Sequence, residues 1–215
     1  MVKNILLFLV FSLIFGTNSQ AQWYSLRKSK PEQKQKVTFQ KDQEGKIIFY
    51  EIVTVDTVSR DTLWKNARVW LRSLLTEKGD KVTSEEFMFG TLEASTSFNV
   101  FIPSVISKIP HGKISYDVIL EIKDKKYRYT FTNFKFYKYK QNRQLKYDLT
   151  KEMKPLEDEK YFGSQGVWNS HRAELKRRVE GQILQLKKQI VVKNRPIVVI
   201  QDSALNKPII RTKDW

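Results

Sequence analysis

The sequence predicts an α+β domain in which an antiparallel sheet carries helices on one face. Between residues 86 and 139, long stretches alternate apolar and polar side chains, which is typical of strands with one buried face. Before and after these strands, apolar residues recur at every third or fourth position, which is typical of helices that pack on a sheet. A chain of 215 residues can bury one sizeable core, so one principal domain is expected.

The first strand and the first helix are expected between residues 46 and 79. The run KIIFYEIVTVD, residues 46–56, is dense in β-branched and aromatic side chains, as strands are. Ser59 follows as the expected N-cap of a helix, and Gly79 is expected to end it. The helix carries an apolar stripe that predicts packing on the sheet, made of Leu63, Ala67, Trp70, Leu71 and Leu74.

Four antiparallel strands are expected in the middle of the chain. A short strand is predicted at residues 86–89, and longer strands with clear alternation are predicted at residues 92–102 and 114–122. Asp124 and Lys125 then supply a tight turn into the fourth strand, which is rich in aromatic residues.

The fourth strand and the segment after it complete the predicted order of strand, helix, four strands, helix. The apolar phase of the fourth strand shifts near Asn133, as it would at a β-bulge. A polar connector, residues 140–166, separates it from the second helix, for which Asn169 or Ser170 is the expected N-cap. Apolar residues at helical spacing mark this second helix: Leu175, Val179, Leu186 and Ile190.

Three stretches of the chain are similar to those of a known family. They are the strand-to-helix opening VSRDTLWKNARVW, the strand FGTLEAS and the hairpin ISYDVILEIKDKKYRYTFTNF. From Ile47 to Tyr139 the chain thus resembles a bacterial domain of unknown function described as having a TATA-binding-protein-like (TBP-like) fold. The resemblance implies that fold, although Lys125 stands in the hairpin turn where the family usually has glycine. The family has no established activity, so the resemblance implies no site residue.

The N-terminus has the pattern of a cleavable signal peptide. Lys3 precedes an apolar run at residues 5–15, and Ser19 and Ala21 are small residues at the two positions that decide cleavage. Cleavage is therefore expected after Ala21. A retained membrane anchor is disfavoured, because the apolar run is well below the roughly 20 residues that span a bilayer. The chain contains no cysteine and therefore can form no disulfide. The signal peptide predicts a periplasmic or secreted location.

The expected organisation has four parts. Residues 1–21 form the signal peptide, and residues 22–45 form a polar lead segment rich in lysine and glutamine. Residues 46–192 form the single TBP-like α+β domain, with the connector inside it, and residues 193–215 form a C-terminal tail. After cleavage no transmembrane segment is expected, since no later apolar run is long enough.

Residues that could support catalysis are few, and no catalytic, cofactor or metal site is predicted. His111 in a predicted loop and His171 in the first turn of the second helix are the two histidines, and both are expected to be exposed. Ser164 lies in FGSQG, which lacks the first glycine of a nucleophile elbow because Phe162 occupies that position. The sequence contains no glycine-rich phosphate-binding loop.

Positive charge is concentrated in the second half of the chain. The formal net charge is +16, and the segment after Lys125 carries 21 basic and 9 acidic residues. The stretch KYRYTFTNFKFYKYK mixes cations with aromatic rings, a pattern of single-stranded nucleic-acid binders, but an amphipathic strand with buried rings is the favoured interpretation. The cations expected to face outward are Lys135, Lys138, Lys140, Arg143, Arg172, Lys176, Arg177 and Arg178.

Three classes of function remain open at this point. The leading interpretation is an exported, non-catalytic envelope protein, a binding or structural module whose basic surface attracts anionic envelope material or an acidic protein. The second is an enzyme of unfamiliar mechanism, which a pocket gathering Glu or Asp around a perturbed pKa would favour. The third is a nucleic-acid binder, which the expected export disfavours, so no nucleic-acid partner is predicted.

Overall fold

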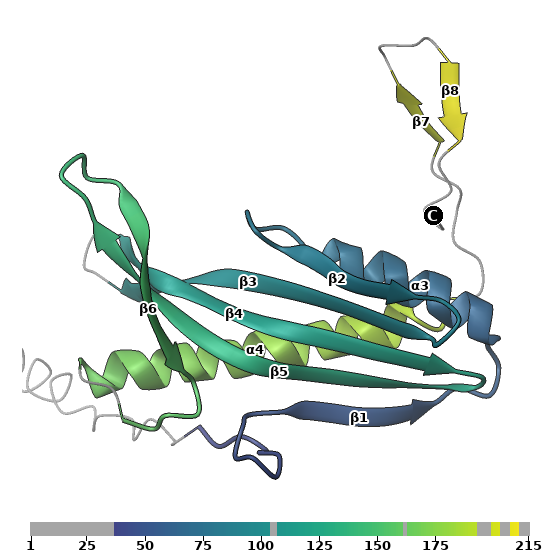
Figure 1. Cartoon of the computed structure of the whole chain (residues 1–215), viewed down its shortest axis with the longest axis horizontal. Coiled ribbons are helices and arrows are strands. Elements are labelled where there is room, and N and C mark those ends of the chain that lie inside the picture. Colours follow the sequence, from purple (N-terminus) through teal and green to yellow (C-terminus); the bar gives the residue numbers. More distant parts are fainter. Residues whose placement is uncertain (1–36, 104–106, 161–162, 193–198, 203–206, 211–215) are drawn as a thin grey trace, which may run out of the picture. The chain divides into compact units, whose positions relative to one another are not determined.

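The structure, a computed structural model, describes residues 37–103, 107–160, 163–192, 199–202 and 207–210 (Figure 1). The predicted signal peptide with its cleavage site after Ala21 lies outside the described residues. The same holds for much of the predicted polar lead and C-terminal tail. In the described part of the chain, no helix combines the length and the hydrophobicity that crossing a bilayer requires.

Six antiparallel strands form the sheet in the described residues. They are β1 (Phe49–Thr54), β2 (Lys81–Glu86), β3 (Thr91–Pro103), β4 (Lys108–Lys123), β5 (Lys126–Gln141) and β6 (Tyr147–Pro155). The order across the sheet is β1-β5-β4-β3-β2, and β6 pairs with the far half of β5. In the described part of the chain, the helices are α3 (Arg60–Ser73) and α4 (Gln165–Gln189), and a hairpin of β7 (Val199–Asp202) and β8 (Lys207–Ile210) follows in sequence.

Both helices pack on the same face of the sheet (Figure 1). Alternate residues of β3, β4 and β5 are buried on this face, including every second residue from Ile114 to Ile122. Trp70 of α3 meets Phe131 at 6.3 Å between ring centroids, and Trp168 of α4 meets Phe136 at 5.6 Å. The predicted α+β class with helices on one face is therefore confirmed. The rings of β5 from Tyr127 to Phe136 lie in the core, as the amphipathic-strand interpretation predicted, whereas Tyr137 and Tyr139 near the end of the strand are half-buried.

Helix α3 begins where predicted and ends earlier than predicted. The Ser59 side chain accepts a hydrogen bond from the backbone of Thr62, which confirms the N-cap. The helix ends at Ser73, so the prediction that Gly79 ends it is wrong. The Asp80 carboxylate accepts hydrogen bonds from the backbone N–H groups of residues 76 and 77, and these bonds hold the chain in a turn after the helix.

The predicted strand at residues 86–89 is also misplaced. β2 ends at Glu86, and residues 87–90 form the turn into β3. Gly90, at φ +74°, sits where an added Cβ would overlap the carbonyl oxygen of Ile122, so the turn and β4 approach each other closely.

The predicted connector, residues 140–166, contains a fifth consecutive strand, β6, and the start of α4. The order is therefore strand, helix, five strands, helix. Ser164 is the N-cap of α4, so the prediction of Asn169 or Ser170 is wrong. The hydroxyl of Ser170 instead donates a hydrogen bond to the carbonyl of Gly166 within the helix. Because the helix begins before Trp168, this side chain lies in its first turn and is buried.

The hairpin between β4 and β5 and the bulge after it are confirmed. Lys123 pairs with Lys126, leaving a two-residue turn, and the pairing of β4 with β5 shifts opposite Asn133, which has φ 59°. Lys125 in the turn has φ 58°, a left-handed conformation.

Replacing Lys125 with glycine is expected to raise the free energy of unfolding by about 0.5–1 kcal/mol, because glycine adopts a left-handed φ without steric cost. Urea unfolding followed by circular dichroism measures the change. Lys126→Gly is the matched control: Lys126 lies in β5, where glycine weakens a strand, so this variant is expected to be less stable. If Lys125→Gly is no more stable than Lys126→Gly, the turn conformation described here is wrong.

Candidate functional site

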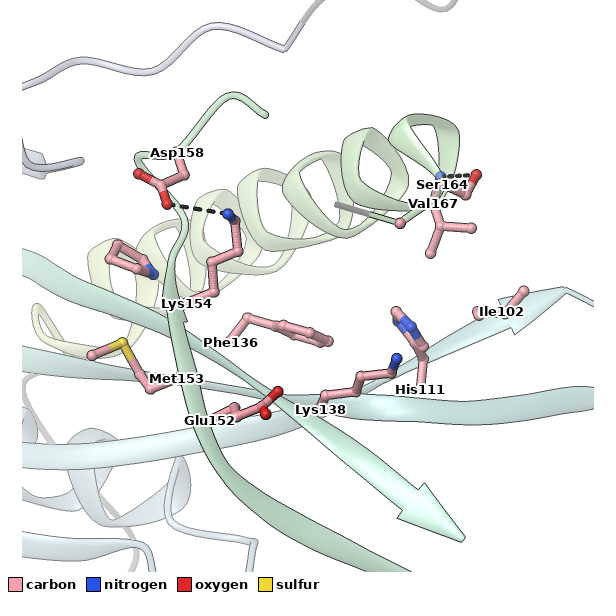
Figure 2. A pocket seen from close by; sticks show the side chains of 12 residues that line it. Ile102, His111, Phe136, Lys138, Glu152, Met153, Lys154, Asp158, Ser164 and Val167 are labelled. Atoms are coloured by element: carbon pink, nitrogen blue, oxygen red, sulfur yellow. Dashed lines mark hydrogen bonds and ion pairs between the residues drawn. The ribbon is translucent and has the colours of Figure 1, made fainter. Parts of the chain in front are cut away.

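A pocket of about 650 Å³ opens where the far ends of β3, β4 and β5 meet β6 and the start of α4 (Figure 2). Its volume is in the range of small-molecule binding sites. Side chains from five elements line it, among them Ile102, His111, Phe136, Lys138, Glu152 and Val167. Because β5 and β6 supply much of the wall, we call it the ribbon pocket.

The floor of the ribbon pocket depends on a close approach of β4 and β5. An added Cβ at Gly112 would overlap the backbone carbonyl of Tyr137 and the ring of Phe136, so only glycine allows the two strands to pack this way. The Phe136 ring lies beside His111, with 5.4 Å between the ring centroids. Residues 110–112 thus belong to β4, and the prediction that His111 lies in a loop is wrong.

The two histidines, which are 60 residues apart in sequence, contact each other at the inner wall of the pocket. Nδ1 of His111 lies 2.6 Å from Nε2 of His171, so one nitrogen donates a hydrogen bond to the other. His171 is 2% exposed and His111 is half-buried, so the expectation of two exposed histidines is wrong. Because α4 begins at Gln165, His171 lies in its second turn and faces the sheet.

Burial keeps both imidazoles neutral near pH 7. Burial, together with a smaller effect of the neighbouring His111, lowers the pKa of His171 from 6.5 to about 4. Burial also lowers the pKa of His111, and the Lys138 ammonium group, seen beside the ring in Figure 2, adds to this effect. Since Nδ1 of His111 is engaged with His171, Nε2 is the ring nitrogen that remains for a ligand in the pocket.

The charged residues of the ribbon pocket fall into two groups. Lys154 and Asp158 form an ion pair at 3.2 Å across the start of the loop after β6 (Figure 2). Lys138 and Glu152 stand at the rim and are exposed. With an apolar floor and charges of both signs at the rim, the pocket suits a ligand that combines an apolar part with charged groups.

The described residues contain no group of three or more His, Asp or Glu side chains arranged to hold a metal ion. The pocket does gather two carboxylates, Glu152 and Asp158, and burial lowers the pKa of His111 in its wall.

Residues 49–137 match the model of a family described as a domain of unknown function (DUF4468) with TBP-like fold. The domain has a TBP-like fold. The resemblance predicted for residues 47–139 is thereby confirmed, and the family brings no catalytic or binding role to this TBP-like domain.

Two solved structures resemble this TBP-like domain. A DUF4468 family protein from Bacteroides ovatus ATCC 8483 is 13% identical, with 72% of this chain and 92% of that chain covered and a TM-score of 0.54. A TBP-like protein from Parabacteroides distasonis ATCC 8503 is also 13% identical, with 68% and 96% covered and a TM-score of 0.49. No curated protein matches the sequence. At this identity the likeness concerns the fold alone, and β6 and α4, which complete the ribbon pocket, lie beyond the residues matched by the family model.

Next to the ribbon pocket, β5 and β6 continue as a two-stranded ribbon beyond the rest of the TBP-like sheet (Figure 1). The pairing of β5 with β4 ends at Lys138, whereas its pairing with β6 continues to Gln141. We call residues 138–155 the basic ribbon. Its exposed cations are Lys138, Lys140, Arg143, Lys146 and Lys151, and its exposed large apolar side chains are Leu145, Tyr147, Leu149 and Met153.

The outward-facing cations predicted from the sequence lie on β5, on the rest of this ribbon and on α4. Lys138, Lys140 and Arg143 are exposed on the ribbon, whereas Lys135 of β5 and Lys176 of α4 are half-buried. In the part of the chain that the structure describes, no carboxylate forms an ion pair with the five exposed ribbon cations.

The other three predicted cations, all on α4, have partners within the domain. Arg172 is buried with its guanidinium 5.1 Å from the ring of Phe39, so the prediction that it faces outward is wrong. Arg177 and Arg178 both bind the carboxylate of Glu174, at 2.7 and 2.8 Å. The predicted cations on the basic ribbon are therefore more available to a ligand than Arg172, Arg177 and Arg178 of α4.

Proposed function

We propose that this chain is an exported, non-catalytic binding module of the bacterial envelope that holds anionic envelope material on its basic ribbon. The observation that carries the proposal is the row of exposed ribbon cations without ion-pair partners among the described residues, next to an open pocket. The N-terminal pattern of Lys3, an apolar run, Ser19 and Ala21 supports export. The scarcity of catalytic groups supports a binding role.

The spread of the ribbon cations favours a polyanion, and we propose an acidic glycan. Cations distributed along an extended ribbon meet several charges of one polymer at once, which raises affinity without any single strong contact. Exposed apolar side chains alternate with these cations, and the Tyr139 and Tyr147 rings lie 6.5 Å apart on the ribbon. A glycan offers both anionic groups and the weakly polar faces of its rings to such a surface.

A second candidate is an enzyme acting at the ribbon pocket. It is favoured by the neutral His111, which His171 orients and which lies in a pocket with Glu152 and Asp158. A positioned, neutral imidazole can accept a proton from a bound molecule. We favour the binding module over the enzyme, because a binding surface accounts for the exposed ribbon cations, whereas catalysis in the pocket does not.

The proposed function predicts retention on immobilised heparin, used as an acidic-glycan probe, that depends on the ribbon cations. We expect Lys138→Gln/Lys140→Gln to elute at clearly lower salt than the wild-type chain, because it removes two exposed charges from the ribbon. Exposed ion contacts weaken as the Debye length falls from about 10 Å at 0.1 M salt to about 3 Å at 1 M.

The matched control for this retention test is Arg177→Gln/Arg178→Gln. It changes the net charge by the same amount, but both guanidinium groups already bind Glu174, so its elution is expected to stay close to wild type. Equal shifts for the two double variants would show that retention follows net charge alone and would overturn the proposed ribbon site. Equal retention on neutral agarose would do the same.

A further inference from the structure

At the end of the sheet opposite the ribbon pocket, the turn between β2 and β3 exposes three large apolar residues in a row. Phe87, Met88 and Phe89 are 45%, 84% and 79% exposed. We call residues 87–89 the apolar tip. Single exposed apolar residues are common on proteins, but a contiguous exposed group is typical of an interaction site.

The backbone of the apolar tip is held in place from α3. The Arg60 guanidinium donates hydrogen bonds to the carbonyl oxygens of Phe87 and Met88, at 2.5 and 3.1 Å. The Phe87 ring packs against Trp64, with 5.4 Å between centroids, and under the same guanidinium at 5.0 Å. Phe87 therefore anchors the turn, and the backbone that carries the exposed side chains of Met88 and Phe89 is tied to α3.

Cations flank the apolar tip on the neighbouring turn. The amide of Ile122 donates to the carbonyl of Gly90 at 2.7 Å, which ties the β2–β3 turn to the end of β4. The β4–β5 turn follows directly, and its exposed lysines are Lys123, Lys125 and Lys126, with one acidic residue, Asp124, among them. The apolar tip thus protrudes beside a turn in which three exposed lysines outnumber one aspartate, although the exposed carboxylates of Glu86 and Asp56 also lie at this end of the sheet.

We propose that this end of the domain docks on an anionic phospholipid membrane, with Met88 and Phe89 in the interface and the lysines of the neighbouring turn against the phosphate groups. A protein partner would need a cavity shaped to receive the protrusion, whereas a bilayer interface accepts exposed apolar side chains of any shape. Nearby lysines add attraction to anionic head groups. This surface is distinct from the basic ribbon and does not depend on the proposed glycan binding.

Co-sedimentation with vesicles tests the proposal, using vesicles of phosphatidylcholine alone or with phosphatidylglycerol. Proteins are purified after expression of the full chain and checked by mass spectrometry to share one N-terminus. Met88→Ser/Phe89→Ser is expected to lower partitioning onto the anionic vesicles by about tenfold or more, because it removes two large apolar groups from the interface. Replacing the three turn lysines by Gln is expected to lower binding to the anionic vesicles only.

The matched control is Leu145→Ser/Leu149→Ser, which removes exposed apolar side chains from the basic ribbon and is expected to leave partitioning unchanged. Equal losses for the two Ser double variants would overturn the proposal. Retention on heparin is expected to be unaffected by Met88→Ser/Phe89→Ser, so failure of the membrane proposal and failure of the glycan proposal are distinguishable.

A site-specific label gives a second, independent readout. The chain has no cysteine, so Phe89→Cys can carry an environment-sensitive dye at a unique position. We expect its emission to shift to the blue on adding anionic vesicles, and the same dye at Leu149→Cys to stay unchanged. A shift that appears without vesicles and grows with protein concentration would show that a second copy covers the tip, and would overturn the membrane assignment.

Discussion

Trp70→Ala is expected to lower the free energy of unfolding by about 3–5 kcal/mol, as truncation of a large buried aromatic residue does. Trp70 has no exposed surface, and its ring meets Phe131 edge-on at 6.3 Å, between α3 and β5. Alanine would leave a cavity at the centre of the helix–sheet interface, because the rigid sheet cannot close around it. Urea unfolding followed by circular dichroism measures the loss.

Trp70→Phe is the matched control for this truncation. The indole Nε1 of Trp70 is buried and has no hydrogen-bond partner within the described part of the chain, so phenylalanine removes an unsatisfied donor while keeping most of the ring. Its cost is expected to be less than half that of alanine. An unfolding curve of Trp70→Ala that matches wild type would show that α3 does not dock on the sheet through this residue.

The second large effect concerns pH: we expect His171 to lower the free energy of unfolding as the pH falls. Burial lowers the pKa of His171 from 6.5 to about 4 in the folded chain, so between these values the unfolded chain binds a proton that the folded chain does not. The stabilising contribution is complete above pH 6.5 and is lost as the pH falls toward about 4. The shift corresponds to about 3 kcal/mol over the whole range and about 2 kcal/mol between pH 7.5 and 5.

His171→Gln tests this effect, because glutamine keeps a hydrogen-bonding group next to His111 and does not titrate. The measured quantity is the difference in unfolding free energy between pH 7.5 and pH 5. It is expected to be about 2 kcal/mol smaller in the variant than in wild type, since the carboxylates contribute equally to both. The same pH dependence in the two proteins would contradict a buried, neutral His171.

The strands with strict alternation were predictable from the sequence, whereas β6 was not. β3 and β4 bury every second residue over most of their length, and this periodicity is visible without a structure. Almost every residue of β6 is exposed, because the strand pairs only with the far half of β5 and covers no core. A strand without a buried face produces no apolar alternation, so residues 147–155 look like a polar connector.

The candidate site was missed for the same reason and one more. The ribbon pocket needs β6 and the early start of α4, and Gly166 in the first turn of α4 conceals that start because glycine is a poor helix former. The contact between His111 and His171 depends on how α4 docks against β4, which no local pattern encodes. Pro110 and Gly112 next to His111 indicate a loop in the sequence, yet Gly112 is the residue that lets β4 and β5 pack closely. Ser164 is a residue type that commonly caps helices, so it could have indicated the early start of α4. Choosing it over Asn169 or Ser170 requires knowing that Trp168 is buried within the helix.

The most direct test of the basic ribbon as the recognition surface is an NMR titration of the ¹⁵N-labelled protein with a short heparin oligosaccharide. If the ribbon holds the polyanion, the largest changes in amide chemical shift will fall within residues 138–155, with smaller changes near His111 at the ribbon pocket. The turn at residues 87–90 and the exposed face of α4 around Arg177 should stay unchanged. Changes centred on α4 or on that turn, or no change at saturating oligosaccharide, would contradict the assignment.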